Sequence, residues 1–412
     1  MGVEVRRVLP GPGLIDAVTL VADLRRAQHQ LSPFHDEVVS LCADLARRLR
    51  RHPEVRRQPA LGALAWWIRA AGIERLRRHW DAIAAVDGTV RVPRGVVFHV
   101  PPTNVDTMFV YSWLLAALAG NANVVRLSPG AVETTGPLLD TLAATLADHP
   151  MVAASTAVVS YGHDDAVSAA LSQGDVRVLW GGDGTIAALR SVPLAPHATE
   201  LAFADRFSFA MLDAGAVLGA DDATVSVLVD GFVNDAYWFD QLGCASPRLI
   251  VWVGDDETTA TAAERFISAL RVQVVRRPER VPTSAVVAKL VHAASVAADG
   301  HVTAFDWQDN DVTVADLDDL RNTPRDGPGG GLFYRARIDR IDDLVDHVTR
   351  RDQTLTTFGF ESTDLHRLAQ TLGARGIDRI VPVGQALTFA NHWDGLDLLH
   401  AFSRTRVVEV GP

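Results

Sequence analysis

The sequence predicts an α/β protein in which parallel, doubly wound sheets form two domains. From Arg94 onward, short apolar runs typical of buried strands alternate with stretches of helical periodicity. Strands that alternate with helices form parallel sheets, because each crossover helix returns the chain to the same end of the sheet. The chain has 412 residues, too many for one simple core, so more than one domain is expected.

Helices are predicted for the first part of the chain, over residues 14–81. Apolar residues recur at helical spacing, for example at Val18, Val21 and Leu24, and Pro53 ends one of these helices. Cys42 falls within the same periodic pattern and is therefore expected in the helical core.

The middle of the chain is predicted to form the first sheet. Apolar runs predict strands over residues 95–100, 123–127, 152–160, 176–180 and 201–212, with helices between them over residues 107–119, 134–147 and 163–172. Such a sheet binds nucleotides at the carboxyl ends of its strands. The glycine-rich turn at residues 181–184 either presents N–H groups to a phosphate or is simply a tight turn.

A second α/β unit is predicted for the rest of the chain. Strands are expected over residues 249–253, 354–360 and 379–382, and helices over residues 221–230, 258–270 and 364–372. Residues 301–331 are less regular and end in Pro-Gly-Gly-Gly, which predicts a surface hairpin or loop. A β-rich tail follows at residues 405–410.

Cys244 is the candidate nucleophile. It lies between Gly243 and the small residues Ala245 and Ser246, directly before the apolar run at 249–253. A thiol in a small-residue loop before a buried strand has room above its sulfur for a substrate. The alternative is a structural thiol, since unpaired cysteines are among the most buried residues.

Composition argues against several classes of protein. A formal net charge of -11 is not typical of a nucleic-acid-binding protein, which presents a basic face. Lys289 is the only lysine, and its neighbours resemble neither a P-loop nor a pyridoxal-phosphate site. No His or Cys spacing resembles a zinc site, so no metal is expected.

The cysteine count and the apolar runs predict a cytoplasmic protein. Two cysteines cannot form a disulfide framework, which favours a reducing compartment. The N-terminus lacks the apolar core of a signal peptide. The longest apolar stretch, residues 108–119, is too short to span a bilayer, so no membrane association is expected.

Four segments carry a more specific pattern. They are residues 95–104 with Asn104 in a turn, Gly-Asn-Ala-Asn-Val-Val-Arg-Leu-Ser at 120–128, Val-Leu-Trp-Gly-Gly-Asp at 178–183, and Asp-Gln-Leu-Gly-Cys-Ala-Ser-Pro at 240–247. The runs at 379–384 and 392–395 fit the same pattern. In this order they resemble the acyl-CoA reductase family typified by the bioluminescence fatty-acid reductase, a branch of the aldehyde dehydrogenase superfamily. Arg126 stands where the superfamily has Lys.

The resemblance implies an aldehyde-dehydrogenase-like fold with two sheet domains. It implies a helical N-terminal segment (1–88), a cofactor domain (89–212), a catalytic domain (213–384) and a C-terminal segment (385–412). The last segment is expected to return to the cofactor domain and to serve oligomerisation, so a homo-oligomer is expected.

The resemblance also implies NAD(P)H-dependent reduction of an acyl thioester to an aldehyde, with coenzyme A or a carrier protein as the acyl donor. Cys244 would take the acyl group, and its backbone N–H and the Asn104 side chain would hold the oxyanion. His392 is a candidate proton donor in the C-terminal segment, with a surface or capping histidine as the alternative. Asn104 could equally be a turn former.

One departure from the superfamily favours reduction. Aldehyde-oxidising members carry a Glu on the fifth strand that activates water, and aligning residues 201–208 puts Ala202 at that position, with Glu200 two residues earlier. Without that base, a thioester waits for hydride or thiol exchange. Two alternatives stay open: an aldehyde dehydrogenase working in the oxidative direction, and a non-catalytic subunit that holds acyl groups.

The segment after the second strand predicts NADPH, with NADH possible. NAD-preferring superfamily members often place a carboxylate there, whereas this chain has no acid before Glu133. Arg126 can grip a 2′-phosphate through two parallel N–H donors, and Ser128 can add a hydroxyl. If Arg126 only packs against the adenosine, the preference disappears. The other predicted cofactor-binding residues are Pro102, Gly181, Gly182 and Asp183.

Overall fold

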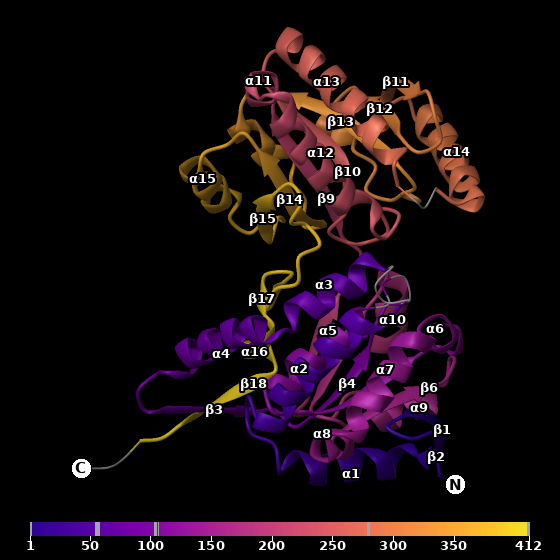
Figure 1. The fold of residues 1–412 in the computed structure, drawn as a ribbon, viewed down its shortest axis with the longest axis vertical. Helices are drawn as coiled ribbons and strands as arrows, with labels where there is room; N and C mark the ends of the chain where they lie inside the picture. Colours follow the sequence, from indigo (N-terminus) through magenta and orange to yellow (C-terminus); the bar gives the residue numbers. More distant parts are fainter. Residues whose placement is uncertain (1, 54–57, 103–104, 106, 278–280, 410–412) are drawn as a thin grey trace. The chain divides into compact units, whose positions relative to one another are not determined.

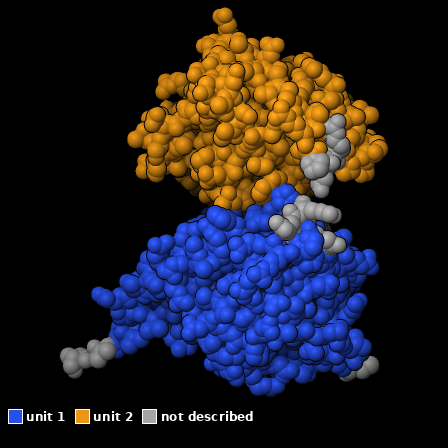
Figure 2. Space-filling view, in the orientation of Figure 1, with its two compact units in different colours: residues 1–204, 389–412 blue, residues 205–388 orange. Residues whose placement is uncertain are grey.

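The computed structural model describes residues 2–53, 58–102, 105, 107–277 and 281–409. It divides into two compact units (Figure 2): unit 1 is Met1–Ala204 with Phe389–Pro412, and unit 2 is Asp205–Thr388. The sequence placed boundaries after residues 88, 212 and 384, whereas the compact units divide after residues 204 and 388. Each unit contains its own parallel-dominated sheet, which confirms the predicted α/β class.

Unit 1 is built on a sheet whose described strands have the order β2-β1-β6-β5-β4-β7-β8 (Figure 1). The strands are β1 (Glu4–Leu9), β2 (Gly13–Asp16), β4 (Val96–Val100), β5 (Ala122–Leu127), β6 (Thr156–Ser160), β7 (Val176–Trp180) and β8 (Thr199–Phe203). In this order, all neighbouring strands from β6 through β5, β4 and β7 to β8 are parallel. Strand β1 runs antiparallel to both β2 and β6.

The helices of unit 1 cover both faces of this sheet. They are α1 (Ala17–Gln28), α2 (Asp36–Arg51), α3 (Pro59–Trp67), α4 (Ala70–Ala84), α5 (Met108–Leu118), α6 (Pro129–Thr134), α7 (Gly136–Ala147), α8 (Pro150–Ala154), α9 (Asp165–Leu171), α10 (Asp183–Arg190) and α16 (Leu398–Ala401). Helix α5 is apolar on every side because it lies between the sheet and α2, and all of its residues are buried.

The C-terminal segment belongs to unit 1. Two short antiparallel pairs join it to itself and to the N-terminal part: β16 (His392–Trp393) with β17 (Leu396–Asp397), and β18 (Ser403–Val407) with β3 (Thr89–Pro93). Asn121 ties the same region together. Its Oδ1 accepts from the backbone N–H groups of Arg94 and Gly95, both at 2.9 Å, and its Nδ2 donates to the Phe402 carbonyl at 2.9 Å.

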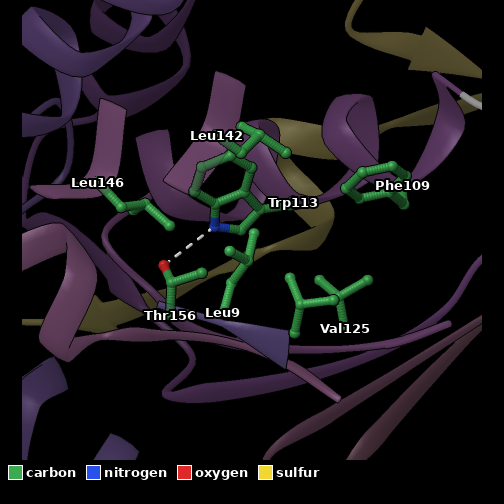
Figure 3. A pocket seen from close by; sticks show the side chains of 8 residues that line it. Leu9, Phe109, Trp113, Val125, Leu142, Leu146 and Thr156 are labelled. Carbon is green, nitrogen blue, oxygen red and sulfur yellow. Dashed lines mark hydrogen bonds between the residues drawn. The ribbon is translucent and has the colours of Figure 1, made fainter. Parts of the chain in front are cut away.

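A small apolar gap is present within unit 1, between α5, α7 and the sheet. Figure 3 shows Trp113 at its centre, with Nε1 donating to Thr156 Oγ1 at 3.1 Å. The cavity of about 10 Å³ is lined mainly by apolar side chains such as Leu9, Val125 and Leu142. Because that volume accommodates about one water molecule, we regard it as a packing defect and not as a ligand site.

Unit 2 contains a second sheet, with the order β11-β12-β13-β10-β9-β14-β15 among its described strands. These are β9 (Phe207–Asp213), β10 (Pro247–Val253), β11 (Val302–Trp307), β12 (Thr313–Leu317), β13 (Leu332–Ile338), β14 (Asp352–Phe358) and β15 (Arg379–Pro382). All neighbours are parallel except β11 and β12.

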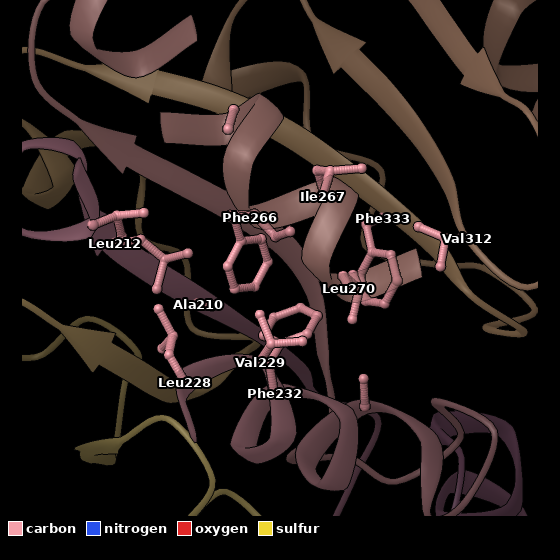
Figure 4. Close-up of a cluster of buried hydrophobic side chains, with 14 of the residues drawn as sticks. Ala210, Leu212, Leu228, Val229, Phe232, Phe266, Ile267, Leu270, Val312 and Phe333 are labelled. Atoms are coloured by element: carbon pink, nitrogen blue, oxygen red, sulfur yellow. The ribbon is translucent and has the colours of Figure 1, made fainter. Parts of the chain in front are cut away.

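Helices on each face of the second sheet bury its two apolar surfaces. The helices are α11 (Ala214–Gly219), α12 (Asp222–Tyr237), α13 (Asp256–Val274), α14 (Thr283–Ala298) and α15 (Ser362–Leu372), with 3₁₀ turns at Leu320–Asn322 and Ile341–His347. On the face of α12 and α13, the ring centroid of Phe232 lies 5.2 Å from those of both Phe266 and Phe333 (Figure 4). The other face packs against α14 and α15.

Three predicted elements differ from the structure. The single strand expected over residues 201–212 is two strands in two sheets, β8 and β9, because the polar residues Asp205 and Arg206 interrupt the apolar run. The first residues, expected to lead into helices, form the hairpin β1–β2, whose charged edge residues hide the alternation. The strand expected over residues 152–160 begins only at Thr156, because Pro150–Ala154 form helix α8. The hairpin expected within residues 301–331 is present as β11 and β12, whereas the following strand β13 was not predicted.

Candidate active site

Cys244 lies in the loop between α12 and β10, at the amino ends of three parallel strands of unit 2. The Ser208 hydroxyl at the start of β9 donates to the Cys244 carbonyl at 2.7 Å. Ser208 Oγ in turn accepts from the Thr354 N–H at 3.1 Å. Gln353 of β14 points its Nε2 at the Cys244 Sγ, at 3.6 Å. The half-buried thiol is therefore positioned by both strands that flank β9 and by β9 itself.

Gln241 braces the nucleophile loop from within. Its side chain is fully buried, with Nε2 donating to the carbonyls of Pro247 and Leu332, both at 3.1 Å. Its Oε1 accepts from the Gly331 N–H at 2.7 Å. Gln241 and its neighbour Asp240 both have left-handed backbone conformations, with φ of 61° and 51°. The amide side chain thus satisfies three backbone groups that a tight, strained turn would otherwise leave unpaired.

Arg248 places a guanidinium beside the nucleophile. The residue lies in a bulge of β10, because Pro247 pairs with Ser208 while Leu249 pairs with the next residue of β9. Its side chain donates to the carbonyls of Gln241 and Gly327, each at 3.2 Å. Burial lowers the pKa of Arg248, and Cys244 is the largest of the nearby negative groups that act in the opposite direction. The guanidinium of Arg248 therefore lies within electrostatic reach of Cys244.

Asp235 fixes the other side of the loop. Its carboxylate accepts from the N–H groups of Gly384 and Ala386, at 2.6 and 2.9 Å. Leu387, one residue further on, lies against the loop at Gly243. Burial raises the pKa of the Asp235 carboxyl to about 7, because the two N–H groups only partly offset the loss of hydration.

We expect a pH dependence of stability from this carboxyl. The pKa of Asp235 in the folded protein lies above its ordinary value. Its contribution to the free energy of unfolding is therefore fully present below about pH 4 and is lost as the pH rises through about 7. Hydrogen exchange of residues 383–387 should therefore show a lower opening free energy at pH 8 than at pH 5. In Asp235→Asn this change with pH should be absent; an unchanged pH dependence in the variant would contradict the assignment.

The predicted cofactor residues lie together at the carboxyl edge of the sheet of unit 1. Pro102 follows β4, Ser128 follows β5, and Gly181, Gly182 and Asp183 follow β7. Strand β4 lies between β5, which follows it in the chain, and β7, which the chain adds later on the opposite side of β4. The carboxyl edge at β4 is therefore the topological switch point of the sheet. Asn104, the second predicted oxyanion donor, lies outside the described residues.

Arg126 and the helix starts at this edge offer donors for a phosphate-containing cofactor. Arg126 donates to the Gly162 carbonyl at 3.0 Å and lies over the Tyr161 ring at 5.2 Å, while its buried Nε has no acceptor among the described residues. The Ser128 hydroxyl caps α6 by accepting from the Ala131 N–H at 3.1 Å, and it keeps its own O–H as a donor. Helix α10 begins at Asp183, and its N-cap residue, Gly182, has no side chain that could cap the first N–H groups.

His392 lies on β16, where its ring meets the ring of His79 edge-on at 5.4 Å. It belongs to unit 1, whereas Cys244 belongs to unit 2. The structure brings His392 together with His79 and Asp397, and its role as a proton donor stays a prediction.

Comparison with known proteins decides the family. The sequence profile of the acyl-CoA reductase (LuxC) family matches residues 78–405, which is well over half of the chain. The chain belongs to the LuxC family of acyl-CoA reductases. Its first 77 residues lie outside the match.

A long-chain acyl-protein thioester reductase from Aliivibrio fischeri is 24% identical over 303 residues. That similarity covers 71% of this chain, and the chain spans only 59% of the relative's length. The resemblance proposed from the sequence motifs is thereby confirmed.

Solved structures place the LuxC-family chain in the aldehyde dehydrogenase fold. A betaine aldehyde dehydrogenase from Staphylococcus aureus, solved in complex with NAD⁺, superposes with a TM-score of 0.65 at 14% identity, over 95% of this chain and 86% of the other. A 1-pyrroline-5-carboxylate dehydrogenase from Thermus with bound NAD gives a TM-score of 0.66 at 13% identity, over 95% and 84%. At these identities the likeness establishes the fold alone.

Sequence analysis missed the residues that position Cys244 in this LuxC-family chain. Ser208 and Gln353 lie 36 and 109 positions away along the sequence. No local pattern marks a residue whose role depends on strand order. Arg248, in contrast, lies four residues after Cys244, and an isolated arginine at the start of an apolar strand was a visible signal.

Proposed function

We propose that the chain reduces an acyl thioester to the corresponding aldehyde through a covalent thioester on Cys244. The observation that carries this proposal is the built nucleophile loop, in which Gln241 fixes the turn, Gln353 contacts the thiol and Arg248 binds the loop at the Gln241 carbonyl. Membership of the LuxC family of acyl-CoA reductases supports the same class of reaction. No helix among the described residues is both long and apolar enough to cross a membrane.

The reaction balances with one hydride and one proton. The Cys244 thiolate attacks the acyl carbon, and the donor thiolate leaves and takes up a proton. A reduced nicotinamide, when bound, would supply the hydride that brings the enzyme thioester to the aldehyde level. Collapse of the resulting oxyanion breaks the bond to Sγ, which releases the aldehyde and regenerates the Cys244 thiolate. The Cys244 N–H and Asn104 are the donors we propose for the oxyanion, as in the resembling family.

The environment of Glu200 favours the reductive direction. Its carboxylate accepts from Arg177 at 3.0 and 2.6 Å and from Arg190 at 2.7 Å. Burial raises the pKa of Glu200, but the hydrogen bonds from Arg190 and Arg177 outweigh it and leave the pKa below its ordinary value. A carboxylate held by two guanidinium groups is a poor base for activating water, so Glu200 does not replace the Glu that aldehyde-oxidising enzymes use.

A nicotinamide assay separates this proposal from its alternatives. With an acyl-CoA or an acyl-carrier protein added, loss of absorbance at the reduced nicotinamide band supports the reductase. Formation of that band with an aldehyde instead supports an oxidative dehydrogenase, and silence in both assays supports an acyl-holding subunit. The relative's name favours a long-chain acyl group on a protein thiol, so both donors belong in the assay.

NADPH is the cofactor we propose. The nicotinamide class is supported by family membership and by the NAD-bound structural relatives. The choice of NADPH rests on Arg126, whose buried Nε lies at the carboxyl edge where the adenosine end of a dinucleotide would bind. A guanidinium grips a phosphate through two parallel donors.

Arg126→Ala should lower kcat/KM with NADPH about ten- to a hundredfold, because one charge-assisted contact contributes roughly 1.5–3 kcal/mol. The value with NADH should change little, since NADH has no 2′-phosphate for the guanidinium to bind. Steady-state kinetics with both cofactors measure the effect, and Arg75→Ala, on the exposed side of α4, is a control. Equal losses with both cofactors, or a wild-type preference for NADH, would exclude Arg126 as the determinant.

We further propose a cytoplasmic homo-oligomer. A reducing compartment keeps Cys244 as a thiol. The two-stranded sheet of β3 and β18 carries exposed valines at Val90 and Val407, with Val408 beyond, which suits a surface covered by a second copy. Size-exclusion chromatography of the wild type against Val90→Glu/Val407→Glu tests this, and an unchanged elution volume would contradict it.

A further inference from the structure

Three potential metal ligands converge in unit 1. His79 comes from α4, while His392 and Asp397 come from the hairpin of β16 and β17. One ligand atom from each lies within 4.8 Å of the other two. His79 Nε2 is 2.6 Å from Asp397 Oδ2, and the rings of His79 and His392 are 5.4 Å apart. Residues that are more than 300 positions apart in the sequence thus meet at one point.

The hairpin holds its two ligands in place. His392 is the direct cross-strand partner of Asp397, so the two side chains project from the same face. The turn between them requires left-handed backbone at Asp394 and Gly395, with φ of 49° and 73°. The geometry is therefore set by the backbone and not by side-chain packing alone.

The Asp397 carboxylate is oriented by its other oxygen. Oδ1 accepts from the N–H groups of Leu399 and His400, at 3.1 and 3.4 Å, and from Asn391 Nδ2 at 3.3 Å. Oδ2 is left facing the histidines. Metal-binding carboxylates are commonly held in this way, with one oxygen fixed by outer hydrogen bonds and the other directed at the ion.

We propose that His79, His392 and Asp397 bind one divalent late first-row transition metal ion, with Zn²⁺ as the best match. Two imidazole nitrogens and one carboxylate oxygen form a common three-ligand zinc set, with water in the fourth position. Ligand distances of about 2.0–2.2 Å put tetrahedral ligand atoms about 3.3–3.6 Å apart. His79 and Asp397 must separate by less than about 1 Å to admit the ion.

The bound ion would fasten the C-terminal segment to α4. Residues 389–412 return to unit 1 after the whole of unit 2, and β16 and β17 are short, with two residues each. A metal bridge between the hairpin and a long helix would stabilise this return by binding the folded state alone. The predicted absence of a metal site came from sequence spacing, which cannot detect ligands on distant segments.

Calorimetric titration of metal-free protein with Zn²⁺ tests the proposal. One equivalent should bind saturably, and an excess of Zn²⁺ should raise the thermal midpoint of unit 1 by several degrees. His392→Gln removes one ligand but leaves the His79–Asp397 hydrogen bond. It should weaken binding more than the 10- to 100-fold that loss of an outer partner typically costs, with little change in the metal-free midpoint.

Two further variants exclude other zinc ligands. Cys244→Ala removes the half-buried thiol of unit 2 and should retain the site. His197→Gln breaks a different histidine–carboxylate pair, His197 with Asp175 at 3.2 Å, and should also retain it. Absence of saturable binding in the wild type, unchanged affinity in His392→Gln, or loss of binding in Cys244→Ala would each overturn the proposal and leave the three residues as an ordinary hydrogen-bonded cluster.

Discussion

Cys244→Ala should abolish both acyl labelling and aldehyde formation. Loss of a catalytic nucleophile lowers turnover by on the order of 10⁴-fold or more, because the loop contains no second thiol to carry the acyl chain. Intact-mass spectrometry after incubation with a long-chain acyl-CoA, without reductant, should show an acyl adduct on the wild type and none on the variant. The variant should fold, since Ser208 bonds the Cys244 carbonyl and not its side chain.

Cys42 provides the matched control for this experiment. It is fully buried in α2, and burial raises the pKa of its thiol to about 12, so it should neither take an acyl group nor react with an alkylating agent in the folded protein. Cys42→Ala should therefore keep the adduct and the turnover. An adduct that persists in Cys244→Ala, or that maps to Cys42, would show that the nucleophile has been assigned wrongly.

Gln241→Leu should strongly destabilise the nucleophile loop while preserving side-chain volume. It leaves the Gly331 N–H and the carbonyls of Pro247 and Leu332 buried without their partner. Each such group costs about 1–3 kcal/mol, so we expect a loss on the order of 3 kcal/mol or more for local opening of unit 2. Displacement of the thiol by as little as ~1 Å should also lower kcat about a hundredfold.

Hydrogen exchange of peptides covering β10 and β13 measures the first effect, and single-turnover reduction measures the second. Gln370→Leu makes the same substitution on the exposed side of α15 in the same unit, where a change within about 0.5 kcal/mol is expected. If Gln241→Leu exchanges like Gln370→Leu, the buried amide does not hold the loop. If exchange increases but kcat is unchanged, the brace is structural and does not position the thiol.

The sequence determined the class of fold and the candidate nucleophile because both are local properties. The alternation of apolar strands with helices is a periodicity within 10–15 residues, and it predicted the parallel sheets. The loop around Cys244 combines its cysteine, small residues and following strand within a few positions. The resemblance to the acyl-CoA reductases was also based on short, contiguous motifs, and the family profile confirmed it.

Only the tertiary structure decided which residues surround these positions. Gln353 and Ser208 reach Cys244 because β14, β9 and β10 are neighbours, which depends on strand order and not on spacing along the chain. The run at 201–212 was assigned to one strand because periodicity cannot tell which sheet a strand joins. The contact between His79 and His392 likewise depends on the tertiary fold and not on spacing along the chain. Pairing across the fold is fixed by the burial of whole faces, and that free energy belongs to the folded chain and not to any short segment of it.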